Sequence, residues 1–259
     1  MNLQLEGKRA LVTGSTAGIG FAIAETLANE GASVIVNGRT QKRVDDALAR
    51  LKGNVEGIAA DLGTAEGAAE VARRFPEVDI LVNNLGIFEV KPFEQIDDDD
   101  WRRFFEINVM SGVRMSRQYL PGMLLRNWGR IIFISSESGV QIPTEMIHYG
   151  MTKTAQIAIA RGLAETTKGT NVTVNSVLPG PTASEGVGNF VKSMAEAQKT
   201  DAATVEREFF KSVRPSSLIR RFSRTDEVAA LVAFVASPLS SSTNGAALRV
   251  DGGVVQGIL

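Results

Sequence analysis

The chain has 259 residues, of which 44% are hydrophobic, and a formal charge of −1 with an isoelectric point near 6.0. It contains no cysteine, and Lys and Arg form no dense block, so disulfides, thiol nucleophiles and cysteine-based metal sites are excluded and a nucleic-acid partner is disfavoured. No apolar run approaches membrane-spanning length, and the first residues lack the layout of a signal peptide. We therefore expect a cytoplasmic protein with neither a metal site nor a membrane partner.

Short apolar runs rich in Val and Ile alternate with segments of helical period along the whole chain. We predict strands at 8–14, 32–38, 55–61, 79–86, 129–136, 171–180 and 246–253. In the segment 19–31, Ile19, Ile23 and Leu27 share one helix face, and Gly31 suits the helix end. Because no linker interrupts the alternation, we expect one α/β domain over residues 1–259. Its core would be a Rossmann-type, doubly wound parallel sheet of about seven strands with helices on both faces.

The first strand leads into the turn "TGSTAGIG", residues 13–20, which opens the first helix. Gly14 allows a tight turn, Gly18 lets the backbone approach a pyrophosphate, and Gly20 lets the helix pack closely on the sheet. The free N–H groups of the helix N-terminus favour phosphate. Although the spacing is Gly-x-x-x-Gly-x-Gly, its position after the first strand predicts a dinucleotide site. The residues expected to bind the cofactor here are Gly14, Ser15, Thr16, Gly18, Ile19 and Gly20.

The end of the second strand, "VIVNGRT", indicates which dinucleotide is bound. An acid at this position binds the ribose 2′-hydroxyl of NAD, whereas an Arg accommodates the 2′-phosphate of NADP. Gly38 stands where the acid is expected, Arg39 follows, and the next acid is Asp45. The sequence therefore favours NADP(H) over NAD(H), the alternative being that Arg39 is merely solvated.

The full set of motifs resembles the short-chain dehydrogenase/reductase family, and in particular its 3-oxoacyl-acyl-carrier-protein reductases. These motifs are "TGSTAGIG", "NNLG" (83–86), Asn108 in "EINVM", Ser136 in "ISSESG", "YGMTK" (149–153) and "LPGPTAS" (178–184). The resemblance runs from about Gly7 to the C-terminus. The sequence departs from the family at Leu85, where Ala is usual, and at "TNG" (243–245).

The resemblance implies a catalytic tetrad of Asn108, Ser136, Tyr149 and Lys153. Tyr149 would be the general acid or base, and a cation one helical turn away is expected to lower the pKa of its phenol from near 10. Ser136 would bond the substrate oxygen, and Asn108 would hold a water in the proton relay. A Ser–His hydrolase built on the lone His148 is disfavoured because the chain has no Gly-x-Ser-x-Gly elbow.

The remaining cofactor contacts are assigned by their position after the strands. Asp61 and Leu62 would meet the adenine, and the loop after the sixth strand would bond the carboxamide. The expected cofactor-binding residues outside the first turn are Arg39, Asp61, Leu62, Asn84, Gly86, Tyr149, Lys153, Pro179, Gly180, Thr182 and Ser184.

Together these features predict an NADP(H)-dependent oxidoreductase that transfers hydride reversibly between nicotinamide and a ketone or secondary alcohol. Two alternatives stay open: a dehydratase or epimerase with a resident cofactor, and a non-catalytic NADP-binding regulator. The resemblance implies a homo-oligomer, most simply a tetramer, that pairs the helices expected at 101–127 and 149–168.

Residues 185–222 carry two amphipathic patterns, one of which includes Phe190, and are expected to form either a helical substrate lid or a plain cap on the core. The basic run Arg214, Arg220, Arg221 and Arg224 would attract an anionic group, such as an acyl-carrier phosphopantetheine, or be solvated or paired internally.

Overall fold

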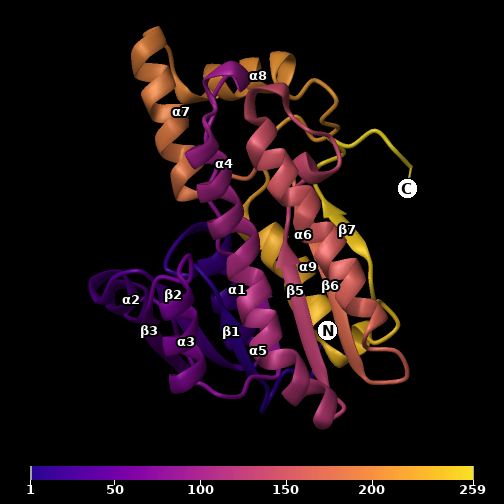
Figure 1. The fold of residues 1–259 in the computed structure, drawn as a ribbon. Coiled ribbons are helices and arrows are strands. Elements are labelled where there is room, and N and C mark those ends of the chain that lie inside the picture. The colour runs from indigo at the N-terminus through magenta and orange to yellow at the C-terminus, as the bar shows by residue number, and fades with distance from the viewer. Residues whose placement is uncertain (1, 259) are drawn as a thin grey trace.

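The computed structural model describes residues 2–258, apart from the side chains of Asn189, Phe190 and Gln198. Its centre is a seven-stranded sheet of order β3-β2-β1-β4-β5-β6-β7, in which neighbouring strands are parallel (Figure 1). The strands are β1 (Arg9–Val12), β2 (Ser33–Gly38), β3 (Val55–Ala59), β4 (Ile80–Asn83), β5 (Gly129–Ile134), β6 (Val172–Pro179) and β7 (Ala247–Val250). The chain runs outward from β1 to β3, returns beside β1 as β4, and runs outward again, which confirms the doubly wound sheet.

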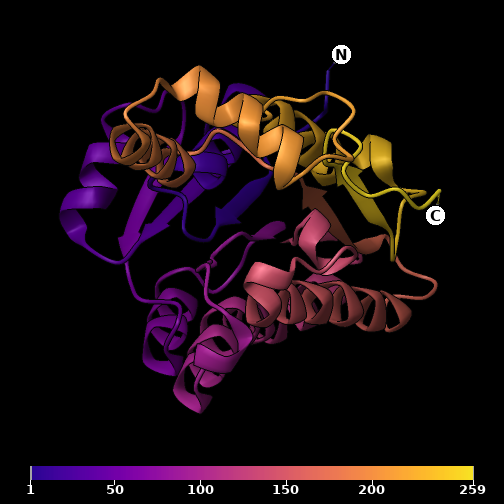
Figure 2. The same cartoon turned by 90° about the horizontal axis from the view of Figure 1, so that it is seen from above.

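Helices cover both faces of this sheet, as the view from above shows (Figure 2). They are α1 (Gly18–Asn29), α2 (Gln41–Leu48), α3 (Ala65–Arg74), α4 (Asp98–Phe105), α5 (Ser111–Leu125), α6 (Ile147–Glu165), α7 (Glu185–Gln198), α8 (Ala202–Ser212) and α9 (Thr225–Ala236). One apolar cluster joins the sheet to α1 and α9, and the other joins it to α3, α5 and α6. Because side chains alternate along a strand, Ala10 and Val12 of β1 enter the first cluster and Leu11 enters the second.

The helix expected at 101–127 is not continuous. It is divided into α4 and α5 by a π-helical turn, η2 (Glu106–Met110). Asp97 caps α4 by accepting a hydrogen bond from the Asp100 N–H, so the acidic run at residues 97–100 lies at a helix N-terminus, where the helix dipole favours negative charge.

The two amphipathic patterns of residues 185–222 correspond to α7 and α8, which lie beyond the carboxyl ends of the strands (Figure 1). Phe210 is buried, and its ring packs against those of Phe209 and Phe222 at centroid distances of 5.0 and 5.1 Å. The side chain of Phe190, which belongs to the predicted pattern of α7, lies outside the described residues. Within residues 2–258, no helix combines the length and the apolar character that crossing a bilayer requires.

Candidate active site

The turn between β1 and α1 has the conformation that its glycines predict. Gly14 and Gly18 have φ values of +60° and +59°, a region that favours glycine. A Cβ on Gly20 would lie 2.4 Å from the side-chain nitrogen of Asn84, so only glycine fits. That side chain donates hydrogen bonds to the carbonyls of Thr13 and Gly14 at 2.9 and 3.1 Å. Asn84, expected to bind the cofactor, thus has its side chain engaged in holding the turn.

Two other expected cofactor residues have their side chains in the framework. Ser15 is fully buried; its hydroxyl donates to the Val12 carbonyl at 2.7 Å and accepts from the Asn37 N–H at 3.0 Å. Ile19 packs against the apolar cluster between the sheet and α1. These side chains therefore shape the turn, and only their backbone remains for a phosphate.

A cleft extends from this turn along the carboxyl ends of β2, β3 and β4. Six of the expected residues line it: Gly14, Thr16, Arg39, Asp61, Leu62 and Gly86. Others that line it were not singled out from the sequence, among them Asn37, Arg43, Arg103 and Glu106. Open α/β sheets bind their ligands at this edge, beside the point where the strand order reverses.

The end of the cleft beside β2 is basic and has no room for an acid. A Cβ on Gly38 would lie 2.4 Å from the Thr16 methyl carbon, so a carboxylate side chain cannot be placed there without rearrangement. Arg39 and Arg43 both line the cleft at this point. Thr40, between them, caps α2 by accepting a hydrogen bond from the Arg43 N–H. Two guanidinium groups at a helix N-terminus suit a phosphate group.

The loop after β6 folds back onto the glycine turn. Thr182 is buried, and its hydroxyl donates to the Gly180 carbonyl at 2.8 Å. Ser184 caps α7, and a Cβ built on Gly18 would lie 3.3 Å from the Ser184 Cβ. Pro179 ends β6. The expected carboxamide loop therefore lies at the same sheet edge as the expected phosphate turn.

Tyr149 and Lys153 lie one turn apart on α6, as their spacing predicts. The Lys153 nitrogen is 5.6 Å from the centroid of the Tyr149 ring and donates to the Ile134 carbonyl at 2.9 Å and to Gln156 Oε1 at 3.1 Å. Lys153 is buried, and this burial lowers the pKa of its ammonium to about 8, although the charge of Glu137 acts in the opposite direction.

The pKa of the Tyr149 phenol is raised, not lowered. Burial is the largest cause and the negative charge of Glu137 is the second, while a hydrogen bond with Ser136 and the charge of Arg214 act in the opposite direction. The expectation that Lys153 lowers the pKa of this phenol is therefore wrong for this structure. Desolvation of the phenol and the charge of Glu137 together outweigh the hydrogen bond with Ser136 and the charge of Arg214.

Asn108 lies in η2, and all the polar groups of its side chain are bonded to protein. Its oxygen accepts from the Ile87 N–H at 2.7 Å, and its nitrogen donates to the Ile87 carbonyl and to the Thr152 hydroxyl, both at 3.0 Å. Its main-chain carbonyl accepts from Gln156 Nε2 at 2.6 Å. The side-chain oxygen keeps a second lone pair that could accept from a water, so the water-holding role expected of Asn108 stays a prediction. Gln156 connects Asn108 to Lys153.

A charged cluster that the sequence did not reveal surrounds Ser136. The Ser136 hydroxyl donates to Glu137 Oε2, and the Ser138 N–H donates to both residues. Arg214, which follows α8, donates to Glu137 Oε1 at 3.2 Å and to Glu145 Oε1 at 2.9 Å. Glu137 and Arg214 are only 4% and 9% exposed. A buried ion pair thus fixes the segment after α8 beside the expected catalytic serine.

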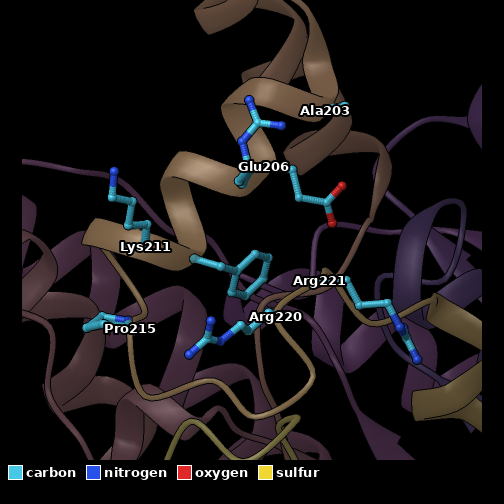
Figure 3. Close-up of a pocket in the computed structure, with 8 residues that line it drawn as sticks. Ala203, Glu206, Lys211, Pro215, Arg220 and Arg221 are labelled. Atoms are coloured by element: carbon cyan, nitrogen blue, oxygen red, sulfur yellow. The ribbon is translucent and has the colours of Figure 1, made fainter.

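A second cavity lies away from this chemistry, between α8 and the loop that follows it (Figure 3). Its basic lining residues are Arg207, Lys211, Arg220 and Arg221. Three members of the basic run considered above are paired internally: Arg221 with Glu227 at 2.8 Å, Arg224 with Asp226 at 2.9 Å, and Arg214 as already described. These contacts favour the alternative of internal pairing for most of the run.

Comparisons with known proteins agree with this fold. The family described as short chain dehydrogenase matches residues 8–195. The chain is 51% identical to an uncharacterized oxidoreductase of Bacillus subtilis, YvaG, over the full length of both. It is 33% identical to the 3-oxoacyl-[acyl-carrier-protein] reductase FabG of Aquifex aeolicus, covering 98% of this chain and 100% of that protein.

Among solved structures, the L-sorbose reductase of Gluconobacter frateurii complexed with NADPH and L-sorbose superposes with a TM-score of 0.92 at 31% identity over all of both chains. The chain belongs to the short-chain dehydrogenase/reductase family and is an NAD(P)-dependent oxidoreductase that acts on CH–OH or C=O groups.

Proposed function

We propose that this protein is an NADP(H)-dependent carbonyl reductase and secondary-alcohol dehydrogenase that uses Tyr149 as its general acid and base. One observation carries the proposal: Gly86 lines the cofactor cleft, and a Cβ on it would lie 3.5 Å from both the Lys153 nitrogen and Asn108 Oδ1. The cleft therefore reaches the neighbourhood of the Lys153 ammonium, one helical turn from Tyr149. When bound, the nicotinamide supplies or accepts a hydride.

The chain's own residues would manage the proton and the substrate oxygen. Tyr149 Oη would give a proton to the oxygen of a reduced ketone, or take it from an alcohol. The hydroxyl of Ser136 would hydrogen-bond the same oxygen, once its proton turns away from Glu137. Lys153 would bind the cofactor ribose with the ammonium proton not already used by Ile134 and Gln156.

The preference for NADP(H) rests on Arg39 and Arg43 and on the lack of room for an acid at Gly38. The similar L-sorbose reductase binds NADPH, which supports the same choice here. The remaining contacts proposed for the cofactor are the backbone of Gly14 through Gly20 and of the loop from Pro179 to Ser184.

The decisive variant is Tyr149→Phe, which removes only the phenolic hydroxyl. NADPH binding measured by calorimetry should persist, while NADPH oxidation with a panel of ketones, keto acids, acyl thioesters and sugars should fall by orders of magnitude. Turnover near that of the parent protein would remove Tyr149 from the mechanism. The same panel separates the proposed reductase from both alternatives. An epimerase or dehydratase with a resident cofactor consumes no net NADPH, and a regulator has no turnover.

We also propose that the chain forms a single domain in which residues 185–222 are a substrate lid. We propose further that four copies assemble into a homotetramer. Arg214 ties the end of the lid to the catalytic loop, which supports a role in enclosing substrate. Exposed apolar side chains, including Phe105 at 42% and Leu218 at 82%, support burial against further copies. Light scattering at micromolar concentration should give four times the chain mass, and a monomer mass would contradict the assembly.

A further inference from the structure

The most unusual feature of the site is the cluster of Glu137, Arg214 and Glu145. We propose that this cluster restricts the enzyme to uncharged ketones and secondary alcohols and rejects substrates that carry a carboxylate or phosphate near the reacting carbon. This inference rests on the function proposed above and names its substrate class.

The cluster has an excess of negative charge. Arg214 is bonded to two carboxylates, so one guanidinium faces two anions and the net charge is −1. Glu137 and Arg214 are almost fully buried, and solvent and salt therefore screen this charge weakly. Glu145 is half-buried, which leaves it within reach of a substrate.

The excess charge lies at the reacting atoms. Glu137 bonds directly to the hydroxyl of Ser136, which is expected to touch the substrate oxygen. The field of Glu137 also reaches Tyr149, since it raises the pKa of that phenol by disfavouring negative charge there. An anionic group on the substrate would experience the same repulsion.

Nearby cations do not cancel the excess negative charge of the cluster. The guanidinium of Arg214 is engaged by Glu137 and Glu145 and also by its neighbour's carbonyl at 3.0 Å. The Lys153 ammonium donates to Ile134 and Gln156, and its pKa is lowered to about 8. The remaining proton of Lys153 is assigned above to the cofactor ribose, and the charge of Arg214 is already shared by two carboxylates, so neither cation offers an unshared charge to a substrate carboxylate.

Apolar side chains beside Tyr149 favour an uncharged substrate as well. The ring of Phe88 lies edge-on to that of Tyr149 at a centroid distance of 6.5 Å and is 54% exposed. Ile142 is 42% exposed and would be in contact with a Cβ on Gly150, the residue after Tyr149. These surfaces can be covered by the uncharged part of a substrate without desolvating an ion.

The test uses two substrates with the same ketone, acetoacetate and its methyl ester, reduced with NADPH. For the parent protein, kcat/KM should favour the uncharged ester at least tenfold. Glu137→Gln, which keeps the shape and removes the charge, should narrow this ratio at least fivefold, mainly through a lower KM for acetoacetate. Glu145→Gln should narrow it less, because its carboxylate is nearer solvent. Glu208→Gln, on the exposed side of α8, is the matched control and should leave the ratio unchanged.

Preference for acetoacetate in the parent protein, or a ratio that Glu137→Gln does not alter, would overturn the proposal. If neither compound is reduced, turnover of the wider panel decides the proposed function separately from this inference. The charge preference is then measured by calorimetric titration of both compounds into protein saturated with NADP⁺. The inference is supported if the parent protein binds acetoacetate more weakly than the ester and Glu137→Gln strengthens the binding of acetoacetate. Equal binding of the two compounds by the parent protein refutes it.

Discussion

Lys153 provides a direct test of the electrostatics of the site through Lys153→Met. The substitution removes the ammonium but keeps an unbranched apolar chain of similar length in a position that is 5% exposed. It also leaves the Ile134 carbonyl and Gln156 Oε1 without this donor, so the stability at one pH mixes several effects. The pH dependence of the stability isolates the effect of the Lys153 ammonium charge.

Burial lowers the pKa of Lys153 from 10.5 to about 8 in the folded protein. Between these two values the unfolded chain holds the proton and the folded protein does not, so folding becomes more favourable as pH rises through this window. A difference of about 2.5 pKa units corresponds to roughly 3 kcal/mol. Below pH 8 both states are protonated, and the parent protein bears the full cost of the buried charge.

We expect the stability of the parent protein relative to Lys153→Met to rise by about 2 kcal/mol between pH 7 and pH 10, most of the full window. Urea unfolding followed by Trp fluorescence at pH 7, 8.5 and 10 measures this, and other titrating groups cancel in the difference. Lys52→Met, at an exposed position, controls for the loss of one lysine. The difference in stability between the parent protein and this control should not change with pH. A parent-minus-variant difference that is constant, or that falls with pH, would refute a buried ammonium with a lowered pKa.

Three further predictions follow from the cleft, the core and the lid. Arg39→Ala and Arg43→Ala should each weaken NADPH binding at least tenfold, about 1.4 kcal/mol, and change NADH binding little; a parent protein that binds NADH more tightly in calorimetry would contradict this. His148 is fully buried and its pKa is lowered by that burial, so stability should fall as pH drops below about 6.5, and His148→Leu should remove this part of the slope in urea unfolding at pH 7.5 and 5.5. Limited proteolysis without cofactor should cut first within 185–222 and NADPH should slow it, whereas early cuts elsewhere would argue against a lid.

The fold could be predicted because its signals are local and repeated. Buried parallel strands give continuous apolar runs, and the glycine turn follows the first of them. The interruption at η2 could not be predicted in the same way. A single π-turn adds one residue to a helical pattern, and the surrounding apolar periodicity continues in α4 and α5.

In the candidate site too, contacts between residues close in sequence could be predicted and contacts between distant residues could not. Tyr149 and Lys153 are four residues apart, so helix geometry places them together without knowledge of the fold. Arg43 could have been found from its position one turn after Arg39. Glu137 and Arg214 are separated by 77 residues, and their contact depends on where the segment after α8 docks. A sequence pattern does not contain that information.

Gln156 shows how far such a tertiary contact reaches into the chemistry. Its buried amide accepts from Lys153 at 3.1 Å and donates to the Asn108 carbonyl at 2.6 Å, so it positions the ammonium against η2. Gln156→Leu removes an acceptor from Lys153, which should lower its pKa further and move the basic limb of the kcat profile about one pH unit lower. Gln156→Glu places a carboxylate at the same atom and should move that limb higher, because an anion favours the charged ammonium. If Gln156 acted through packing alone, the two variants would not shift the basic limb in opposite directions. If both variants lose stability and leave the basic limb where it is in the parent protein, Gln156 does not act through Lys153.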